Sequence, residues 1–255
     1  MRNRYKKYLE YVKVTKTHNT YETYRTALSY FPTGSEEEIK AVLEDESISD
    51  STKSLRLRIF KAAQKFYGYW NQDYAMLVDG FRPNEEVQPC PTAEEVARMI
   101  SIVKLPHQRM ALMLMAYNGL RVSEVANLRV EDVDIDKRTI KLIGTKGKRD
   151  AVVPIVNPIL LDLIAKQIAD KETGMTVCGI CVGTLKNLCH SIAKKCGYPY
   201  HAHSLRRFFA NTLKKNSIPI EDIQTLMRHK SIMTTRRYLN IDTEDSRNVL
   251  EGVAF

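Results

Sequence analysis

Residues 203–209 read His203-Ser-Leu-Arg206-Arg207-Phe208-Phe209, and they are the most informative stretch of the chain. His203 and Arg206 lie three positions apart, so the two side chains share one face of a helix. Leucine and phenylalanine occupy the opposite side, where they would anchor that helix in a core. The stretch therefore predicts a well-anchored helix that presents an imidazole and a guanidinium together.

Further polar side chains flank this helix in the sequence. His229 and the run Thr-Thr-Arg-Arg-Tyr238 follow it, and Gly-Leu-Arg121-Val-Ser-Glu124 precedes it at the start of another helix. A cation in the first turn opposes the helix dipole, so Arg121 costs a little stability there. A functional role would explain this placement, and so would a capping or salt-bridge role for Arg121 considered alone.

Periodicity predicts a mainly helical chain with a small antiparallel sheet. Apolar residues at helical spacing indicate helices over 2–14, 20–30 and 51–70, and a capping box at Ser35 starts a short one. Beyond a second capping box at Thr92, helices are expected over 106–118, 121–128, 158–171, 184–195, 203–215, 219–228 and 231–239. Residues 138–144 and 151–155 alternate as strands instead, which predicts a hairpin between them.

A stretch rich in proline and glycine divides the chain. Residues 79–91 contain Gly80 and three prolines and show no clear period, which is typical of a linker. We therefore expect a small helical domain over 1–78, a linker over 79–91, and a larger domain of helices and antiparallel strands over 92–255.

The 255 residues include 39 Lys and Arg against 30 Asp and Glu, a formal net charge of +9. A hydrophobic fraction of 44% excludes wholesale disorder, and no apolar run reaches the ~18 residues of a membrane span. No apolar segment follows the basic N-terminus, so we expect no secretory signal and a cytoplasmic protein. Residues 1–90 hold 14 basic and 13 acidic side chains, whereas residues 91–255 hold 25 and 17. Such a concentrated basic surface favours a phosphate-bearing partner, because each contact releases counterions.

Several familiar chemistries have no support in the sequence. No glycine-rich phosphate loop of Walker or Rossmann type and no His-Glu-x-x-His metal motif occurs. Four of the five cysteines cluster, at Cys178, Cys181, Cys189 and Cys196. Their spacing suits zinc imperfectly, so zinc, a disulfide and free buried thiols stay open, and free thiols are the interpretation we prefer. We expect no metal and no cofactor.

Together these motifs resemble the tyrosine recombinase (integrase) family, especially its simple Xer-like members. The family order is matched by Arg121, Lys146, His203-x-x-Arg206, His229 and Tyr238. The interval from Arg206 to His229 is 23 positions and that from His229 to Tyr238 is 9, and both are similar to the family spacing. The resemblance covers about residues 92–240, whereas residues 1–78 resemble the family's helical core-binding domain only in length and helicity.

One position departs from the family pattern. Family members often have Leu-Gly before the second histidine, and this chain has Met227-Arg228 before His229. A bulkier residue there would tilt the His229 loop or add a phosphate contact.

The resemblance implies transesterification at a DNA phosphodiester, without ATP or metal. Tyr238 would attack the scissile phosphorus, form a 3′-phosphotyrosine and release a 5′-hydroxyl. Lys146 would protonate the leaving oxygen from the tip of the hairpin, and Lys148 is its rival for that role.

The remaining motif residues would act on the phosphate. Arg121 and Arg206 would straddle the two non-bridging oxygens, because their donor forks suit the charge of the transition state. His203 would assist proton transfer at the nucleophile, and His229 would donate a hydrogen bond to a non-bridging oxygen. Glu124 would support the site without reacting.

Further basic side chains are candidate DNA contacts. Three project from one face of the longest N-terminal helix, where a merely solvated face is equally acceptable: Arg58, Lys61 and Lys65. Five others would touch flanking phosphates: Lys148, Arg149, Arg207, Arg236 and Arg237.

The implied partner is double-stranded DNA with paired half-sites, bound by a tetrameric synapse in the nucleoid. Residues 240–255 resemble the tail that docks on a neighbouring protomer, although a helix closing its own domain is the alternative. Two rival functions stay open: a type IB topoisomerase-like nicking-closing enzyme, and a DNA-binding relative without catalysis.

Overall fold

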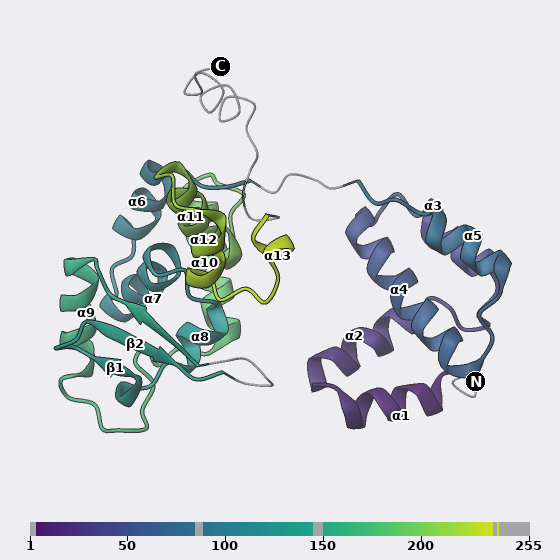
Figure 1. Cartoon of the computed structure of the whole chain (residues 1–255), viewed down its shortest axis with the longest axis horizontal. Helices are drawn as coiled ribbons and strands as arrows, with labels where there is room; N and C mark the ends of the chain where they lie inside the picture. The colour runs from purple at the N-terminus through teal and green to yellow at the C-terminus, as the bar shows by residue number, and fades with distance from the viewer. Residues whose placement is uncertain (1–3, 85–88, 145–149, 237–238, 240–255) are drawn as a thin grey trace, which may run out of the picture. The chain divides into compact units, whose positions relative to one another are not determined.

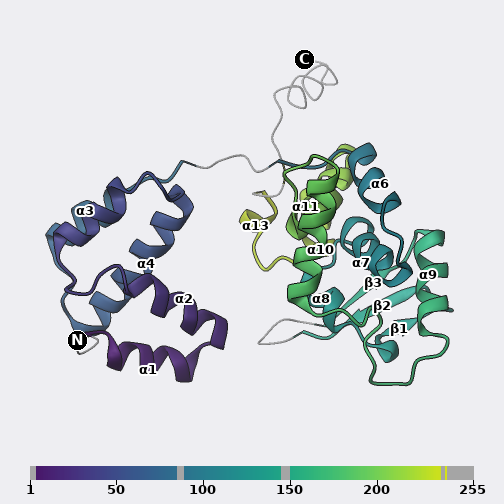
Figure 2. The ribbon, with the colours of Figure 1, turned by 180° about the vertical axis from the view of Figure 1, so that it is seen from behind.

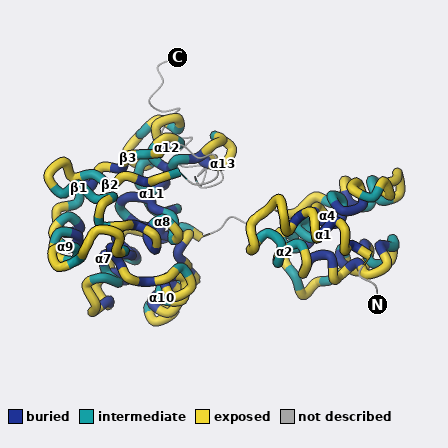
Figure 3. The backbone as a smooth tube through the Cα atoms, turned by 90° about the horizontal axis from the view of Figure 1, so that it is seen from below, coloured by how far each residue is buried: buried dark blue, intermediate teal, exposed yellow. Residues whose placement is uncertain are grey.

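The computed structural model describes residues 4–84, 89–144, 150–236 and 239. The chain divides into two compact units, Met1–Glu86 and Val87–Phe255. Each unit has buried segments of its own (Figure 3). No described helix is both long and apolar enough to cross a membrane.

The described part of the first unit consists of helices (Figure 1). They are α1 (Lys6–Thr15), α2 (His18–Leu28), α3 (Glu36–Glu44), α4 (Asp50–Tyr67) and α5 (Gln72–Gly80). Side chains of Thr17, Ser49 and Asn71 accept hydrogen bonds from the first turns of α2, α4 and α5, which satisfies backbone donors that the helix leaves open.

The longest helix, α4, supplies the middle of this unit's core. Ile59 and Ala63 are buried, as the sequence predicts, and Phe60 packs on Phe31 with ring centroids 4.5 Å apart. Phe66, which belongs to the apolar stripe that the helical spacing predicts with Ile59 and Ala63, is instead 46% exposed, so the prediction was wrong for this residue. It was also wrong for the helix end, because Gly68 adopts a left-handed conformation (φ +74°) and stops α4 at Tyr67.

Helix α5 changes the boundary expected from composition. It runs through Gly80, so the first two residues of the linker predicted over 79–91 are helical. Asn71 caps α5 and Val78 is buried beneath it. Gly80 is therefore the last residue of a helix, although its proline-rich surroundings favoured a loop.

The second unit combines helices with a small sheet. Its described elements are α6 (Ala93–Ser101), α7 (Pro106–Tyr117), α8 (Val122–Asn127), the 3-10 helix η1 (Val130–Asp132), β1 (Val133–Asp134), β2 (Thr139–Leu142), β3 (Ala151–Pro154), α9 (Pro158–Ile168), α10 (Val182–Lys195), α11 (Ala202–Lys215), α12 (Ile220–Leu226) and α13 (Ile232–Arg236). Every residue of α7 from Met110 to Ala116 is buried. Helices α9 and α11 pack on α7 from either side (Figures 1 and 2), so an all-round apolar helix forms the centre of the core.

The three strands form an antiparallel sheet in the order β1-β2-β3. Ile140 of β2 lies opposite Val133 on one side and Val153 on the other. The predicted fold class, mainly helical with a small antiparallel sheet, is confirmed. Strand β1 was not predicted, because two residues are too short to show a period. The hairpin tip, residues 145–149, lies outside the described residues.

Candidate active site

The turn between α7 and α8 positions Arg121. Gly119 in this turn has φ +59°, and a Cβ built on it would lie 2.4 Å from Cδ1 of Phe209, so only glycine fits. Arg121 is the N-cap of α8, and its backbone N donates to Oε2 of Glu124 (2.8 Å). Its Nη1 donates to Oε1 of the same carboxylate (2.6 Å), which offsets the unfavourable dipole that the sequence flagged.

Arg206 is the most deeply buried charge of the site. Its side chain is 1% exposed, and its two terminal nitrogens donate to the carbonyls of Gly119 and Met227. Nη1 also lies 3.8 Å from Oε2 of Glu124. These partners come from the α7–α8 turn, the α12–α13 segment and α8, so one guanidinium joins three parts of the fold. Such pairing is what a buried charge requires.

His229 is buried beside Arg206. Its Nε2 lies 3.3 Å from Nη2 of Arg206, and its Nδ1 lies 2.9 Å from the hydroxyl of Thr235 on α13. Because a guanidinium can only donate, Nε2 accepts here and Nδ1 carries the proton. Burial, and then the charges of Arg206 and Arg121, lower the pKa of His229 to about 3. The ring is therefore neutral, and donating to a phosphate would require the proton on Nε2.

His203 stands near the start of α11 and is exposed. Desolvation of its ring, and then the cations around it, chiefly Arg206, lower its pKa to about 4. A neutral imidazole at neutral pH can accept a proton.

Arg228 belongs to the site, although the sequence left its role open between a tilted His229 loop and a phosphate contact. Its φ is +54°, the left-handed conformation that favours glycine. Its Nη2 donates to Oε2 of Glu124 (2.9 Å) and to the carbonyl of Gly119 (3.0 Å), and its own carbonyl accepts from Nη2 of Arg121 (3.2 Å). The signal that pointed to it was the departure from Leu-Gly.

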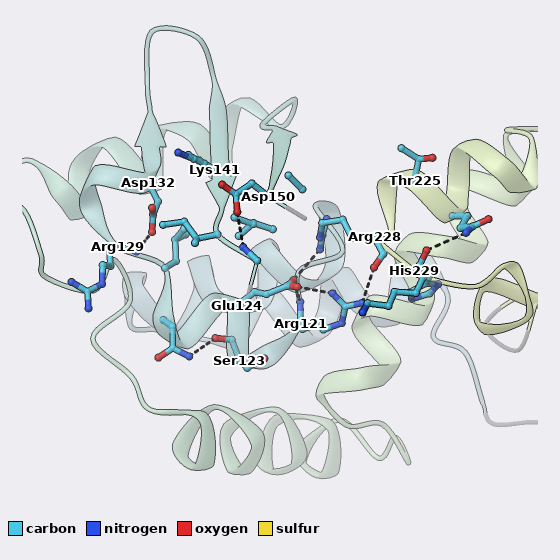
Figure 4. A pocket seen from close by; sticks show the side chains of 18 of the residues that line it. Arg121, Ser123, Glu124, Arg129, Asp132, Lys141, Asp150, Thr225, Arg228 and His229 are labelled. Carbon is cyan, nitrogen blue, oxygen red and sulfur yellow. Dashed lines mark hydrogen bonds and ion pairs between the residues drawn. The ribbon is translucent and has the colours of Figure 1, made fainter. Parts of the chain in front are cut away.

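Glu124 is the common partner of these arginines (Figure 4). Burial alone would raise the pKa of its carboxyl, but Arg228 and then Arg121 hold it below the usual value. Glu124 is therefore ionised, and it accepts hydrogen bonds from both Arg121 and Arg228.

Two cavities meet at Arg121. One, of about 990 Å³, is also lined by Glu124, Arg228 and His229, with Lys141 on the strand side (Figure 4). The other, of about 520 Å³, is lined by Arg121 with His203 and Arg206, and also by Lys186, His190 and His201. The fold thus brings together all the described members of the predicted catalytic set, from α8, α11 and the segment before α13.

The predicted nucleophile and lysine cannot be placed in this arrangement. Tyr238, Lys146 and its rival Lys148 lie outside the described residues, as do Arg149 and Arg237. Tyr238 follows α13 by two positions, and Thr235 on α13 is tied to His229.

The remaining candidate DNA contacts differ in their surroundings. Arg58, Lys65 and Arg236 are exposed, and Arg207 is half-buried on α11. Lys61 instead pairs with Asp79 and lies over the ring of Trp70, 5.0 Å from its centroid.

The cysteines are free thiols. Burial raises the pKa of Cys178 and of Cys189 to about 12, whereas Cys181 is exposed. Among the described residues no group of three or more His, Cys, Asp or Glu is placed to hold a metal.

Comparison with known proteins finds a family match over the part of the chain that contains these motifs. The family model described as "Phage integrase family" matches residues 91–245, a range that contains all six motif residues. The chain belongs to the phage integrase family. The resemblance to tyrosine recombinases is thereby confirmed, and family membership makes the chain a site-specific DNA recombinase.

Two relatives of this phage integrase family member are both named tyrosine recombinase XerA. Tyrosine recombinase XerA of Pyrococcus horikoshii is 27% identical over 232 residues, which cover 87% of this chain and 81% of the relative. Tyrosine recombinase XerA of Thermococcus kodakarensis is 30% identical over 171 residues, 63% and 61% of the two chains.

Solved structures share the fold of this integrase. The Tn1549 transposon integrase in complex with a circular intermediate DNA has a TM-score of 0.76 at 16% identity and covers 98% of both chains. A lambda integrase dimer bound to a COC′ core site has a TM-score of 0.74 at 17% identity and covers 92% and 93%.

Proposed function

We propose that this integrase cleaves and rejoins DNA strands through a covalent 3′-phosphotyrosine formed by Tyr238. The observation that carries the proposal is the cluster of buried Arg206 with half-buried Arg121 and Glu124, beside neutral His229 and His203. Such a cluster suits a phosphodiester, because guanidinium forks match the phosphate oxygens and neutral imidazoles can move protons.

The chemistry conserves bond energy. The hydroxyl oxygen of Tyr238 forms a bond to phosphorus as the bond from phosphorus to the 5′-oxygen breaks, so neither ATP nor a metal is needed to balance the step. A tyrosine hydroxyl has a pKa of about 10, so its proton must be accepted, and His203 takes that role. Lys146, with Lys148 as its rival, supplies the proton to the leaving 5′-oxygen.

The transition state gathers negative charge on the non-bridging oxygens. Arg121 and Arg206 supply charge-assisted donors from a site where low polarity strengthens each interaction. His229 adds a neutral donor once its proton resides on Nε2. Glu124 keeps the arginines oriented and takes no part in the bond changes.

The substrate we propose is double-stranded DNA carrying paired half-sites, bound in the nucleoid. The net charge of +9 supports a polyanionic partner. The solved relatives include an integrase complexed with circular intermediate DNA and an integrase dimer on a core site. Residues 1–78 would form the core-binding domain, and four copies would form the synapse. The proposed docking tail, residues 240–255, lies outside the described residues.

A nicked suicide substrate tests the proposal. The intact chain should form a covalent protein–DNA complex that survives denaturation, and Tyr238→Phe should form none while binding DNA with nearly unchanged affinity. Covalent attachment by Tyr238→Phe would assign the nucleophile elsewhere, and none by the intact chain would favour a DNA-binding relative without catalysis.

A second substrate separates the rival enzyme. A recombinase should resolve a synthetic Holliday junction, whereas a type IB topoisomerase-like enzyme should relax supercoiled plasmid without resolving the junction.

A further inference from the structure

We propose that Arg228 is a positioning residue for strand cleavage, which holds Glu124 and the Gly119 carbonyl so that the Arg121 fork is set for the phosphate. This inference rests on the proposed function. It concerns a position whose backbone adopts the left-handed conformation that favours glycine, and it makes the arginine a functional feature of this chain.

The Arg228 guanidinium joins three segments. Nη2 donates to Oε2 of Glu124 (2.9 Å) and to the Gly119 carbonyl (3.0 Å), while Nη1 donates to the Leu226 carbonyl (2.9 Å). The side chain is 12% exposed. It therefore bridges α8, the turn before α8 and the end of α12, across 104 positions of sequence in the case of Glu124.

The same residue holds the Arg121 fork. One terminal nitrogen of Arg121 donates to Oε1 of Glu124 (2.6 Å), and the other donates to the main-chain carbonyl of Arg228 (3.2 Å). Both acceptors thus depend on Arg228: one is its own carbonyl, and the other belongs to the carboxylate that its guanidinium holds. A small displacement of either would turn the Arg121 fork, and catalysis is sensitive to such displacements.

Backbone conformation gives an independent reason. At φ +54° an arginine is strained relative to glycine. A residue held in a sparsely populated conformation is a candidate functional residue. Here the strain is offset by the contacts to Glu124 and Gly119, which glycine could not make.

Charge points the same way. The guanidiniums of Arg121, Arg206 and Arg228 surround the single carboxylate of Glu124. The cluster therefore keeps a positive excess that complements a phosphorane, and Arg228 contributes to that excess. Arg228 also lines the cavity that Arg121 and His229 line, so a direct phosphate contact is the rival role.

Arg228→Gly is the decisive variant. It removes the guanidinium and relieves the left-handed strain, so the chain should fold. Arg138→Gly is the matched control: Arg138 is exposed, has φ +53°, and lies in the β1–β2 turn away from Glu124. Both variants lose one positive charge and one strained side chain. They differ in the burial of Arg228 and in its contacts with Glu124, Gly119 and Leu226.

Two quantities are measured on a nicked suicide substrate. The first is the rate of covalent complex formation at saturating DNA. The second is the salt slope, that is, the slope of log K for DNA binding against the logarithm of the salt concentration. We expect Arg228→Gly to lower the rate roughly 10–100-fold, as for residues that orient a functional group, with the slope unchanged. Arg138→Gly should keep the wild-type rate. A salt slope lower in magnitude by ~0.9 in Arg228→Gly would make Arg228 a phosphate ligand. A wild-type rate in Arg228→Gly would mean that Arg228 only packs in the site. Either result overturns the inference.

A double-mutant cycle tests whether Arg228 acts through Glu124. On a Glu124→Gln background, Arg228→Gly should have little further effect, because the contact is already weakened. Independent, multiplicative losses would refute the coupling. Arg228→Asn, which tolerates the left-handed conformation, repeats the test if Arg228→Gly unfolds.

The outcome for wild type separates this inference from the proposed function. If wild type forms no covalent complex, the proposed function fails and the inference fails with it. If wild type reacts and Arg228→Gly reacts equally fast, only the inference fails.

Discussion

Gly119→Ala should destabilise the second unit by about 2–5 kcal/mol. An alanine held at φ +59° costs about 1–2 kcal/mol. Its Cβ would lie 2.4 and 2.8 Å from Cδ1 and Cε1 of Phe209, and forcing such overpacking typically costs about 1–3 kcal/mol. The ring is partly buried and packs against the cluster that contains Ala210 and Ile223, so backbone displacement is the other route of relief. That displacement would move the carbonyl that receives Arg206 and Arg228, and cleavage should slow as well.

Alanine substitutions at two other glycines distinguish the cost of backbone strain from the cost of the steric clash with Phe209. Gly174 has φ +92° with nothing within 4 Å of an added Cβ, so Gly174→Ala should lose only the strain, about 1–2 kcal/mol. Gly183 lies in α10 with open space and no positive φ. Gly183→Ala should therefore be neutral or stabilising, by up to ~1 kcal/mol.

Urea unfolding followed by two signals measures these differences. Far-UV circular dichroism reports helices of both units, whereas the chain's one tryptophan, Trp70, lies in the first unit. Gly119→Ala should move the unfolding transition of the second unit, followed by circular dichroism, to lower urea concentration. The transition followed by Trp70 fluorescence should stay where it is. If it destabilised the chain no more than Gly174→Ala, the collision with Phe209 would be refuted.

Further predictions concern catalysis, pH and salt. Arg121→Ala should slow covalent complex formation by several orders of magnitude, and His229→Ala by about 10²–10³-fold, because a neutral donor is worth less than a charged fork; equal rates to wild type would refute the site. The pKa of folded His229, about 3, lies below the usual 6.5, so the unfolded chain binds a proton that the folded chain does not. On account of this group, the free energy of unfolding should therefore fall by up to ~1.4 kcal/mol for each unit by which the pH is lowered from 6.5 to 3. Urea titrations of His229→Gln should lack that component. Changing exposed Arg58 and Lys65 to Ala should lower the salt slope of DNA binding by about 2 if both touch phosphate; an unchanged slope, as expected for the Glu36→Gln control, would mean a merely solvated face.

Sequence alone went far toward the site because its chemistry is carried by short motifs. The helical spacing of His203 and Arg206 predicted their shared element, and α11 carries both. What the motif could not provide is environment: Arg206 is almost completely buried, whereas His203 three positions earlier is exposed. That difference depends on which distant segments cover the helix, and no local period records it.

The missed features have specific physical causes. Arg228 meets Glu124 across 104 positions, and a contact of that range leaves no periodic signal. Helix α5 was obscured because Gly80 adjoins a proline-rich segment, although the cap at Asn71 was available as a start signal. Strand β1 has two residues and is specified by pairing with β2, so its existence depends on tertiary structure.

The burial of Arg206 links the stability of the site to its chemistry. A guanidinium removed from water contributes little net stability even when it is paired, since desolvation offsets most of the attraction. The two carbonyls and the carboxylate around Arg206 therefore do little more than keep the charge tolerable. The same low polarity strengthens the attraction between that charge and a phosphate oxygen, and the fixed partners leave little to reorganise during reaction. An arrangement that adds almost nothing to folding is thus well suited to the strand cleavage that we propose, in which negative charge develops on the phosphate oxygens.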